Sequence, residues 1–458
     1  MRALAGKESC LPRAIPHYAY IVLAIATLGK VFTSPGQSPC IGVVIETVRL
    51  DVGISRSTLT GLYFAATTTS ALMLPLGGKW IDRFGPRVMV GVFAMGLGMA
   101  CAVLSTVPNH TTYTLPQLFG ALFLLRFFGQ GNLMNVSVTE INYWWMKRRG
   151  FVMGVAGSVV SAAMLGIIPL VMMHLIESVG WRGTYVVLAL ACWCVMAPLG
   201  WILFRGKPEE YGLLPDAIVP GEPGLLSSDT DTGTAPPETE EEVNWTTAEI
   251  LRSRSFYVFA LSDLIIAGTG TAFWFHLRPV MSEAHVSDRI VSALYPTLAL
   301  VSIAGRLISG HLIDQTHSQR WVLAIGLVLQ SVGLSLVPVM LNTAAPYRTA
   351  LAYGVAMAMG TSGSFCSNVR STVYAEYYGR KHLGLAQSLA SSLTVFGSAI
   401  GPFPFGLAKD LTGSFGLAFR VAGVFPLLAS LTVLAFGRRG EQPGRVDTKT
   451  RRGNYGAV

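Results

Sequence analysis

Long apolar segments constrain the fold of this chain more than any other feature. A helix of about 20 apolar residues crosses the ~30 Å hydrocarbon core of a bilayer. Stretches of that kind recur along almost all of the 458 residues, and only 13% of the residues are charged. A typical soluble domain has about a quarter of its residues charged. The sequence therefore predicts an all-α, multi-pass integral membrane protein.

Twelve segments fit membrane-spanning helices, with ends placed to within several residues. The first follows a basic N-terminus without a small-residue cleavage site, so we expect a retained helix rather than a signal peptide. The segments are 17–44, 57–78, 87–107, 117–141, 150–176, 182–204, 256–280, 290–313, 320–341, 348–376, 383–408 and 415–437.

Basic residues in the short connectors predict the orientation, because cytoplasmic loops are enriched in Lys and Arg. The richer side carries Lys79, Arg83, Arg87, Lys147, Arg148, Arg149, Arg205, Lys207, Arg320, Arg380, Lys381 and the tail from Arg438 to Arg452. We expect this side and both termini to be cytoplasmic, in a plasma or inner membrane. The net charge of +9 is dispersed over connectors, so no nucleic-acid partner is expected.

The composition changes abruptly after the sixth segment. Residues 208–243 are rich in Pro, Gly, Ser and Thr and end in an acidic run, a composition typical of a linker. Thr246 to Glu249 has the spacing of a helix-capping box and opens a short amphipathic segment. The predicted organisation is an N-terminal six-helix bundle (1–206), a cytoplasmic linker (207–253), a C-terminal six-helix bundle (254–437) and a basic cytoplasmic tail (438–458).

The two halves repeat with a nearly constant offset. Asn135 and Asn368 are 233 residues apart, as are Gly180 and Gly413, while Asp82 and Asp314 are 232 apart. A constant offset at separate places predicts two pseudo-symmetric bundles related by an axis along the membrane normal.

One connector carries a recognisable pattern. Between the second and third segments stands Gly77-Gly78-Lys79-Trp80-Ile81-Asp82-Arg83-Phe84-Gly85-Pro86-Arg87, and a weaker copy, Ser309-Gly310-His311-Leu312-Ile313-Asp314, ends the eighth segment. The pattern G-x-x-x-D-R-x-G-x-R resembles the signature loop of the major facilitator superfamily. The resemblance implies a secondary transporter that works by rocking two bundles around a midplane cavity.

Further stretches resemble one group within that superfamily, the bacterial monocarboxylate and oxalate/formate transporter-like proteins. They are Arg205 to Asp216 (R-x-x-P-E-x-x-G-L-x-P-D), Ser34-Pro35-Gly36-Gln37, Gly305-Arg306 followed by Gly310, and Tyr377-Tyr378-Gly379-Arg380 before Leu383-Gly384. The motifs are specific for this group and say much less about the substrate. An organic anion is favoured by the balance of charges inside the spans, with Lys30, Arg126, Arg306 and Arg370 against Asp263 and Glu140. The animal monocarboxylate transporters carry an aspartate four residues before the arginine of the eighth span, where this chain has Ser302. Proton coupling through that pair does not carry over.

Charged residues inside a bilayer are costly unless they face a partner or a wet cavity, so they mark candidate sites. The resemblance places Arg306 on the carboxylate-binding arginine of the eighth span, and a guanidinium fork suits a carboxylate. The alternative is a structural arginine. Lys30 is a second candidate, unless it is neutralised by Asp263, which lies 233 residues further along. The remaining substrate-binding candidates are polar residues of the spans: Gln37, Tyr63, Asn135, Tyr295 and Asn368.

A second set of residues is expected to act in coupling or gating rather than in binding. It contains Asp82, Arg83, Arg87, Arg126, Asp263, Asp314 and Arg370. Arg126 falls on the arginine of the superfamily's fourth-span motif, and a structural role is equally open for it. Arg370 is expected in the cytoplasmic third as a gate or anchor.

The predicted function is secondary transport of a small organic anion, of the monocarboxylate or dicarboxylate class, with protons as an open coupling ion. Transport of a larger metabolite and a non-transporting membrane sensor remain alternatives. No enzyme activity is expected, because no catalytic constellation is evident, and no cofactor, because the phosphate-binding loop G-x-x-x-x-G-K-[ST] is missing from the sequence. No metal site is expected either, since His311, Asp314 and His317 belong to the second signature loop.

Overall fold

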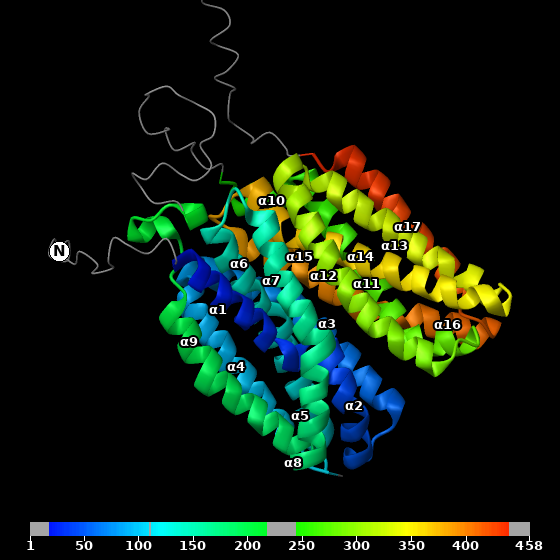
Figure 1. The fold of residues 1–458 in the computed structure, drawn as a ribbon. Helices are drawn as coiled ribbons and strands as arrows, with labels where there is room; N and C mark the ends of the chain where they lie inside the picture. The colour runs from blue at the N-terminus through cyan, green and yellow to red at the C-terminus, as the bar shows by residue number, and fades with distance from the viewer. Residues whose placement is uncertain (1–17, 110, 218–243, 439–458) are drawn as a thin grey trace, which may run out of the picture.

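The computed structural model describes residues 18–109, 111–217 and 244–438, and all regular secondary structure in these ranges is helical. Figure 1 shows two groups of helices, one coloured blue to green and the other green to red. The predicted all-α fold of two bundles is therefore confirmed.

The first bundle contains several helices that are interrupted rather than continuous. It comprises α1 (Tyr18–Phe32), the 3₁₀ turn η1 (Ser34–Gly36), α2 (Ser38–Val52), α3 (Arg56–Phe84), α4 (Pro86–Ser105), α5 (Thr114–Leu124), the π-helix η2 (Leu125–Leu133), α6 (Met134–Trp144), α7 (Arg149–Ala162), the π-helix η3 (Ala163–Ile167), α8 (Ile168–Ala191), the π-helix η4 (Cys192–Met196) and α9 (Ala197–Leu203).

The second bundle has longer helices, and short elements precede it. These are η5 (Pro208–Tyr211), η6 (Pro215–Ala217) and α10 (Thr247–Arg252), followed by α11 (Arg254–Glu283), α12 (Asp288–Thr316), α13 (Gln319–Leu341), α14 (Ala345–Tyr378), α15 (Leu383–Ile400), α16 (Pro402–Thr412) and α17 (Gly416–Phe436). The capping box predicted at the start of α10 is present, formed by Thr246 and Glu249.

By length and hydropathy alone, nine helical stretches in the described ranges could cross a membrane. Three further crossings are more polar or are merged with a neighbour: α5 to α6, α14, and α7 with the first part of α8. The backbone of α8 turns at Gly180, which has a φ of 73°, so α8 contributes to two crossings. Counted in this way, the chain has the twelve expected crossings.

The first predicted span, 17–44, is wrong as a single helix. It consists of α1 and α2 joined by η1, and it extends to Val52. Pro35 has no amide hydrogen to continue a helix. Gly36 packs against the fourth span so closely that an added Cβ would lie 3.0 Å from the amide nitrogen of Gln130.

The eleventh predicted span, 383–408, is also broken, into α15 and α16. The break falls at Gly401 and Pro402. A Cβ at Gly401 would lie 2.8 Å from the carbonyl carbon of Gly268, so this turn needs a glycine where α11 passes.

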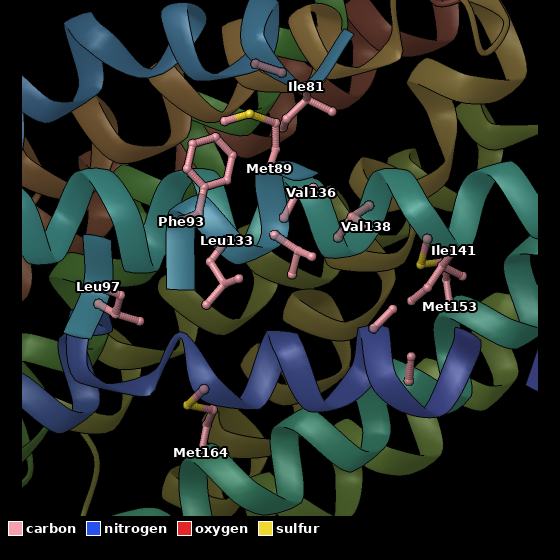
Figure 2. Close-up of a cluster of buried hydrophobic side chains, with 14 of the residues drawn as sticks. Ile81, Met89, Phe93, Leu97, Leu133, Val136, Val138, Ile141, Met153 and Met164 are labelled. Atoms are coloured by element: carbon pink, nitrogen blue, oxygen red, sulfur yellow. The ribbon is translucent and has the colours of Figure 1, made fainter. Parts of the chain in front are cut away.

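Apolar side chains fill the interior of the first bundle. Figure 2 shows this packing for Ile81, Met89, Phe93, Leu97, Leu133, Val136, Val138, Ile141, Met153 and Met164, all of them buried. They come from α3, α4, η2, α6, α7 and η3, and this core holds those helices in fixed positions relative to one another.

The two bundles meet through two equivalent helix pairs, α3 with α15 and α7 with α12. Glycines bring the second pair together, since a Cβ on either Gly150 or Gly310 would lie 2.5 Å from the carbonyl oxygen of the other. Small residues at a crossing allow such close approach of membrane helices. In Figure 1 the start of α1 lies toward the same end of the molecule as α10.

Candidate functional site

Arg306 lies on α12 where that helix passes both α7 of the first bundle and α14 of the second. Its Nε donates to the Oγ of Ser161 at 2.9 Å, and its Nη1 donates to the Oγ of Ser367 at 2.8 Å. Its backbone carbonyl accepts from Asn368 at 2.6 Å. No carboxylate pairs with it among the described residues, and its second terminal nitrogen has no partner there. The guanidinium is thus held in place by hydroxyl groups while its charge stays uncompensated.

Lys30 and Arg370 face the same region. The charges of Arg306 and Arg370 both act on Lys30, which is only 6% exposed. In the described part of the chain, the side-chain nitrogens of Lys30 and Arg370 make no hydrogen bond, yet none of them is sealed from solvent. The three side chains, which we call the cation triad, come from α1, α12 and α14 and therefore from both bundles.

Asp263 on α11 is a carboxylate near this triad, and its pairing with Lys30, which the sequence left open as an alternative, is not observed between the described residues. Among the described residues, no ion pair joins Lys30 to Asp263; instead Asp263 Oδ2 accepts from the hydroxyl of Tyr374 at 3.0 Å. The nearby charge that acts on Asp263 is that of Arg370. Lys30 and Asp263 occupy equivalent positions in the two bundles, and equivalent positions need not touch.

Arg126, in contrast, uses both terminal nitrogens inside the first bundle, while its buried Nε has no partner among the described residues. It donates to Gly36 O at 3.1 Å and to Ser38 Oγ at 3.1 Å, and it also contacts Gln130. Its guanidinium lies 4.6 Å from the centre of the Tyr63 ring. These bonds fasten the break in the first span to η2, so the geometry favours the structural interpretation of Arg126.

The other predicted binding residues fall in different places. Gln37 donates to Thr33 Oγ1 at 3.0 Å, and the hydroxyl of Tyr63 lies 3.4 Å from Ser38 Oγ, so both support the break in the first span. Asn135 lies between the bundles, where it bonds to Ser388 at 3.1 Å and Ser391 at 2.8 Å of α15.

Asn368 and Tyr295 have different surroundings again. Asn368 fixes the backbone of Arg306 and also donates to Ser309 Oγ at 2.8 Å. Tyr295 is 36% exposed and lies against Trp274, with 6.4 Å between ring centres. Asn368 is therefore the polar candidate that directly supports the triad.

Two aspartates, one in each bundle, accept hydrogen bonds from the start of a helix in the other bundle. Asp82, at the end of α3, accepts from the backbone amides of Gly384 at 2.7 Å and Leu385 at 2.9 Å, at the start of α15. Asp314, at the end of α12, accepts from the amides of Gly150 at 2.7 Å and Phe151 at 2.8 Å, at the start of α7. Carboxylates are stabilised at helix N-termini by unpaired amides and the helix dipole.

The basic residues of the first signature loop do not join this contact. Arg87 Nε donates to the carbonyl of Trp201 at 3.0 Å, within its own bundle. The guanidinium of Arg83 lies 5.3 Å from the ring centre of its neighbour Phe84. The gating contact predicted for this loop therefore rests on Asp82.

Residues that the sequence analysis did not assign to a site add to the closure between bundles. Arg149 pairs with Glu376 at 3.1 Å, and Arg380 bonds both to Tyr143 O at 2.8 Å and to Glu209 at 2.6 Å. The hydrogen bonds and ion pairs described above between the two bundles lie at this end or near mid-membrane. In the sequence, only the basic residues that recur after the fourth and tenth spans hinted at these contacts.

The start of the linker is docked rather than free. The carboxylate of Asp216 accepts from the amides of Met146 at 3.0 Å, Lys147 at 2.9 Å and Arg148 at 3.2 Å, just before α7. Asn244, where the described chain resumes, accepts from the amide of Lys381 at 2.9 Å before α15. The two sites are equivalent, and they position the helices whose N-termini bind Asp314 and Asp82.

Comparisons with known proteins agree with this geometry. A family model described as "Major Facilitator Superfamily" matches residues 20–316 and 259–455. The chain is 26% identical over 416 residues to a probable sulfoacetate transporter of Cupriavidus necator, covering 86% of this chain and 88% of that protein. It is 24% identical over 366 residues to monocarboxylate transporter 13 of Bos taurus, with 78% and 75% covered. A probable L-galactonate transporter of Escherichia coli is 22% identical over 412 residues, with 86% and 84% covered.

Solved structures share the fold at low sequence identity. The proton:xylose symporter XylE superposes with a TM-score of 0.67 at 13% identity, covering 92% of this chain and 96% of that one. The human organic anion transporter MFSD10 superposes with a TM-score of 0.65 at 13% identity, covering 91% and 99%.

Proposed function

The chain belongs to the major facilitator superfamily, in its monocarboxylate transporter-like group, and from this premise we propose that it carries a small organic anion across a membrane by secondary transport. It is an integral, multi-pass membrane protein and not an enzyme. The proposed binding site is the cation triad of Lys30, Arg306 and Arg370.

The observation that supports this proposal most strongly is the uncompensated positive charge of the triad. Leaving a cation uncompensated inside a membrane protein is costly, and such residues mark substrate or ion pathways. Arg306 is oriented by Ser161 and Ser367 and still has donors to offer, as a carboxylate or sulfonate would need. The names of the three relatives support the same class, since sulfoacetate, monocarboxylates and galactonate are all organic anions.

Alternating access is the finer part of the proposal. The bundles are joined by Asp82, Asp314 and Arg149 at the end that carries the docked linker. With that end cytoplasmic, as the basic connectors indicate, this state is closed to the cytoplasm. Breaking these contacts and closing the opposite ends would expose the triad to the other side.

Proton coupling is proposed through Asp263. It is a carboxylate, it is only 4% exposed, and it lies within electrostatic reach of Arg370. A proton on Asp263 would raise the net positive charge beside the anion. Uptake that is indifferent to an imposed pH gradient would argue against this coupling.

The test of the main proposal is uptake of labelled acids by vesicles that contain the purified protein. We expect counterflow of at least one small carboxylate or sulfonate, and no counterflow of a neutral sugar such as xylose. Flux of the sugar alone would favour the larger-metabolite alternative. Saturable binding of an acid without any flux would favour the sensor.

A further inference from the structure

The three positive charges of the cation triad are not compensated equally by neighbouring carboxylates. Arg370 has Asp263 within electrostatic reach, whereas the charges that act on Lys30 are both positive, those of Arg306 and Arg370. Arg306 likewise has a positive neighbour, Arg370. With three cations and one carboxylate, the region carries two positive charges in excess.

The hydrogen-bond donors of the triad are also largely unused. A guanidinium has five N–H groups and an ammonium has three. Among the described residues, Arg306 has two side-chain partners, Ser161 and Ser367. Arg370 and Lys30 have none there, and their nitrogens are not sealed from solvent. These free donors come from two bundles and therefore approach a bound molecule from different directions.

We propose, on the basis of the proposed function, that the substrate is a dianion with its two negative groups at opposite ends of a short spacer. One end binds Arg306, and the other lies between Arg370 and Lys30. Ser367, which holds Arg306, and Arg370 are three residues apart on α14, which corresponds to a rise of about 4.5 Å. Ser367 and Arg370 therefore lie on the same face of α14, so that Arg306 and Arg370 can reach one small molecule from adjacent turns.

A monoanion would neutralise only one of the two excess positive charges. It would leave one excess cation in a region of low dielectric, where an unpaired charge is strongly unfavourable. A dianion would neutralise the excess and occupy donors on both bundles at once. Asp263 keeps its place through Tyr374, so it is not available as a direct partner for Lys30.

The experiment compares matched pairs of ligands on the purified, monodisperse full-length chain. Each pair has one skeleton and differs by one negative charge: sulfoacetate with sulfoacetamide, and succinate with succinamate. We expect the dianion of at least one pair to bind about tenfold more tightly or better at constant ionic strength. Equal affinities within every pair that binds would overturn the dianion proposal and leave the small-anion function intact. Failure of all four ligands to bind would remove the small-anion function itself.

Two variants test which side chains bind the second negative group of the dianion. Lys30→Gln and Arg370→Gln should each lower the affinity ratio of dianion to monoanion several-fold, while the monoanion affinity changes less. The control is Lys409→Gln, because Lys409 pairs with Glu283 at the far end of the second bundle. It should leave the ratio unchanged. If both triad variants keep the wild-type ratio, the assignment of the second anionic group is wrong; if one variant fails to fold, the other decides.

Discussion

Two buried arginines of this protein show how the use of hydrogen bonds separates a binding residue from a structural one. Arg126 is 2% exposed and gives its terminal nitrogens to Gly36, Ser38 and Gln130, all within its own bundle. Among the described residues, Arg306 has two side-chain partners, both hydroxyl groups, and these lie on different bundles. The terminal nitrogens of Arg126 are occupied by the fold and its remaining Nε is buried, so it cannot readily bind a ligand, whereas the second terminal nitrogen of Arg306 stays available.

We predict that Arg306→Ala weakens substrate binding by roughly 3–5 kcal/mol, a loss of about a hundredfold to several thousandfold in affinity. Arg306→Lys should fall between this variant and the wild type, because lysine keeps the charge but loses the planar fork. The measurement is ligand binding to purified, monodisperse protein. Unchanged affinity in Arg306→Ala would contradict the anion site.

The matched variant is Arg126→Lys. A lysine cannot reproduce the several bonds that join η1 and α2 to the fourth span, so we expect a lower thermal unfolding temperature. The protein that remains folded should bind substrate with an affinity within a few-fold of the wild type. A selective loss of binding with normal thermal stability would instead place Arg126 in the transport site.

For single residues, the sequence indicated which side chains could bind an anion but not which of them lie next to one another. The resemblance pointed to Arg306 as the residue that binds the carboxylate. Its place between the bundles is consistent with that role, which stays a prediction. A pairing of Lys30 with Asp263 was an open alternative, and their 233-residue offset identifies only equivalent positions in the two bundles. Arg370 was expected to act as a gate; its membership of the triad depends on α12 and α14 packing side by side, which no local pattern encodes.

Among the elements, the helices α7 and α15 have the same role in the two bundles. Each begins with backbone amides that bind an aspartate of the opposite bundle, and each is preceded by a loop whose amide is bound by a linker residue. The sequence predicted the two signature loops and a coupling or gating role for Asp82. It did not predict that the bound terminus belongs to the other bundle, because the partners Asp82 and Gly384 are 302 residues apart.

We predict that Asp82→Asn favours separation of the bundles at the linker end. The substitution removes the charge from two hydrogen bonds, and bonds to a charged group contribute about 1.5–3 kcal/mol. Turnover should fall while substrate affinity stays within a few-fold, because Asp82 lies away from the triad. Asp314→Asn should behave in the same way, since its contact is equivalent.

The readout is a cysteine placed at Thr139, which is fully buried between the bundles. Its reaction with a thiol reagent should become faster in Asp82→Asn. The control is Asp410→Asn, since Asp410 is exposed on α16. Loss of substrate binding with normal turnover in Asp82→Asn would contradict the gating role.

The docked start of the linker gives a second prediction for the elements. Asp216→Ala should destabilise the protein by about 1–3 kcal/mol, because three amides before α7 lose their acceptor. Asp216→Asn should be milder, since asparagine tolerates the left-handed backbone of this residue (φ 64°) and still offers one acceptor. Thermal unfolding of the purified variants measures this.

Replacing residues 218–243 with a Gly/Ser segment of equal length is the matched control for the linker. These residues lie outside the described part of the chain, and their expected role is only to connect the bundles. The replacement should leave both stability and transport near the wild-type level. If it abolishes a signal from a protein that binds an acid but shows no flux, the sensor alternative gains support.

For the molecule as a whole, hydropathy and the internal repeat were enough to predict twelve crossings in two bundles. They were not enough to predict the breaks in the first and eleventh spans, which depend on Gly36 and Gly401 meeting a neighbouring helix. Nor could they show that the bundles meet at the linker end, because a repeat describes each bundle and not the angle between them. The domain boundaries and the orientation in the membrane stay predictions.

The orientation is tested by cysteines placed on opposite sides of the membrane. Asn109 and Asn342 are exposed at one end of the bundles, and Arg83 is exposed at the other. Cysteines at the first two positions should react with an impermeant reagent added outside intact cells, and a cysteine at Arg83 should not, because basic loops face the cytoplasm. Cys194 is itself exposed and must first be replaced by alanine. The reverse labelling pattern would overturn the orientation and would make this state the one closed to the outside. In the expected orientation, a cysteine placed at Lys30 should be labelled from the outer side only, because the bonds that join the bundles lie toward the linker end.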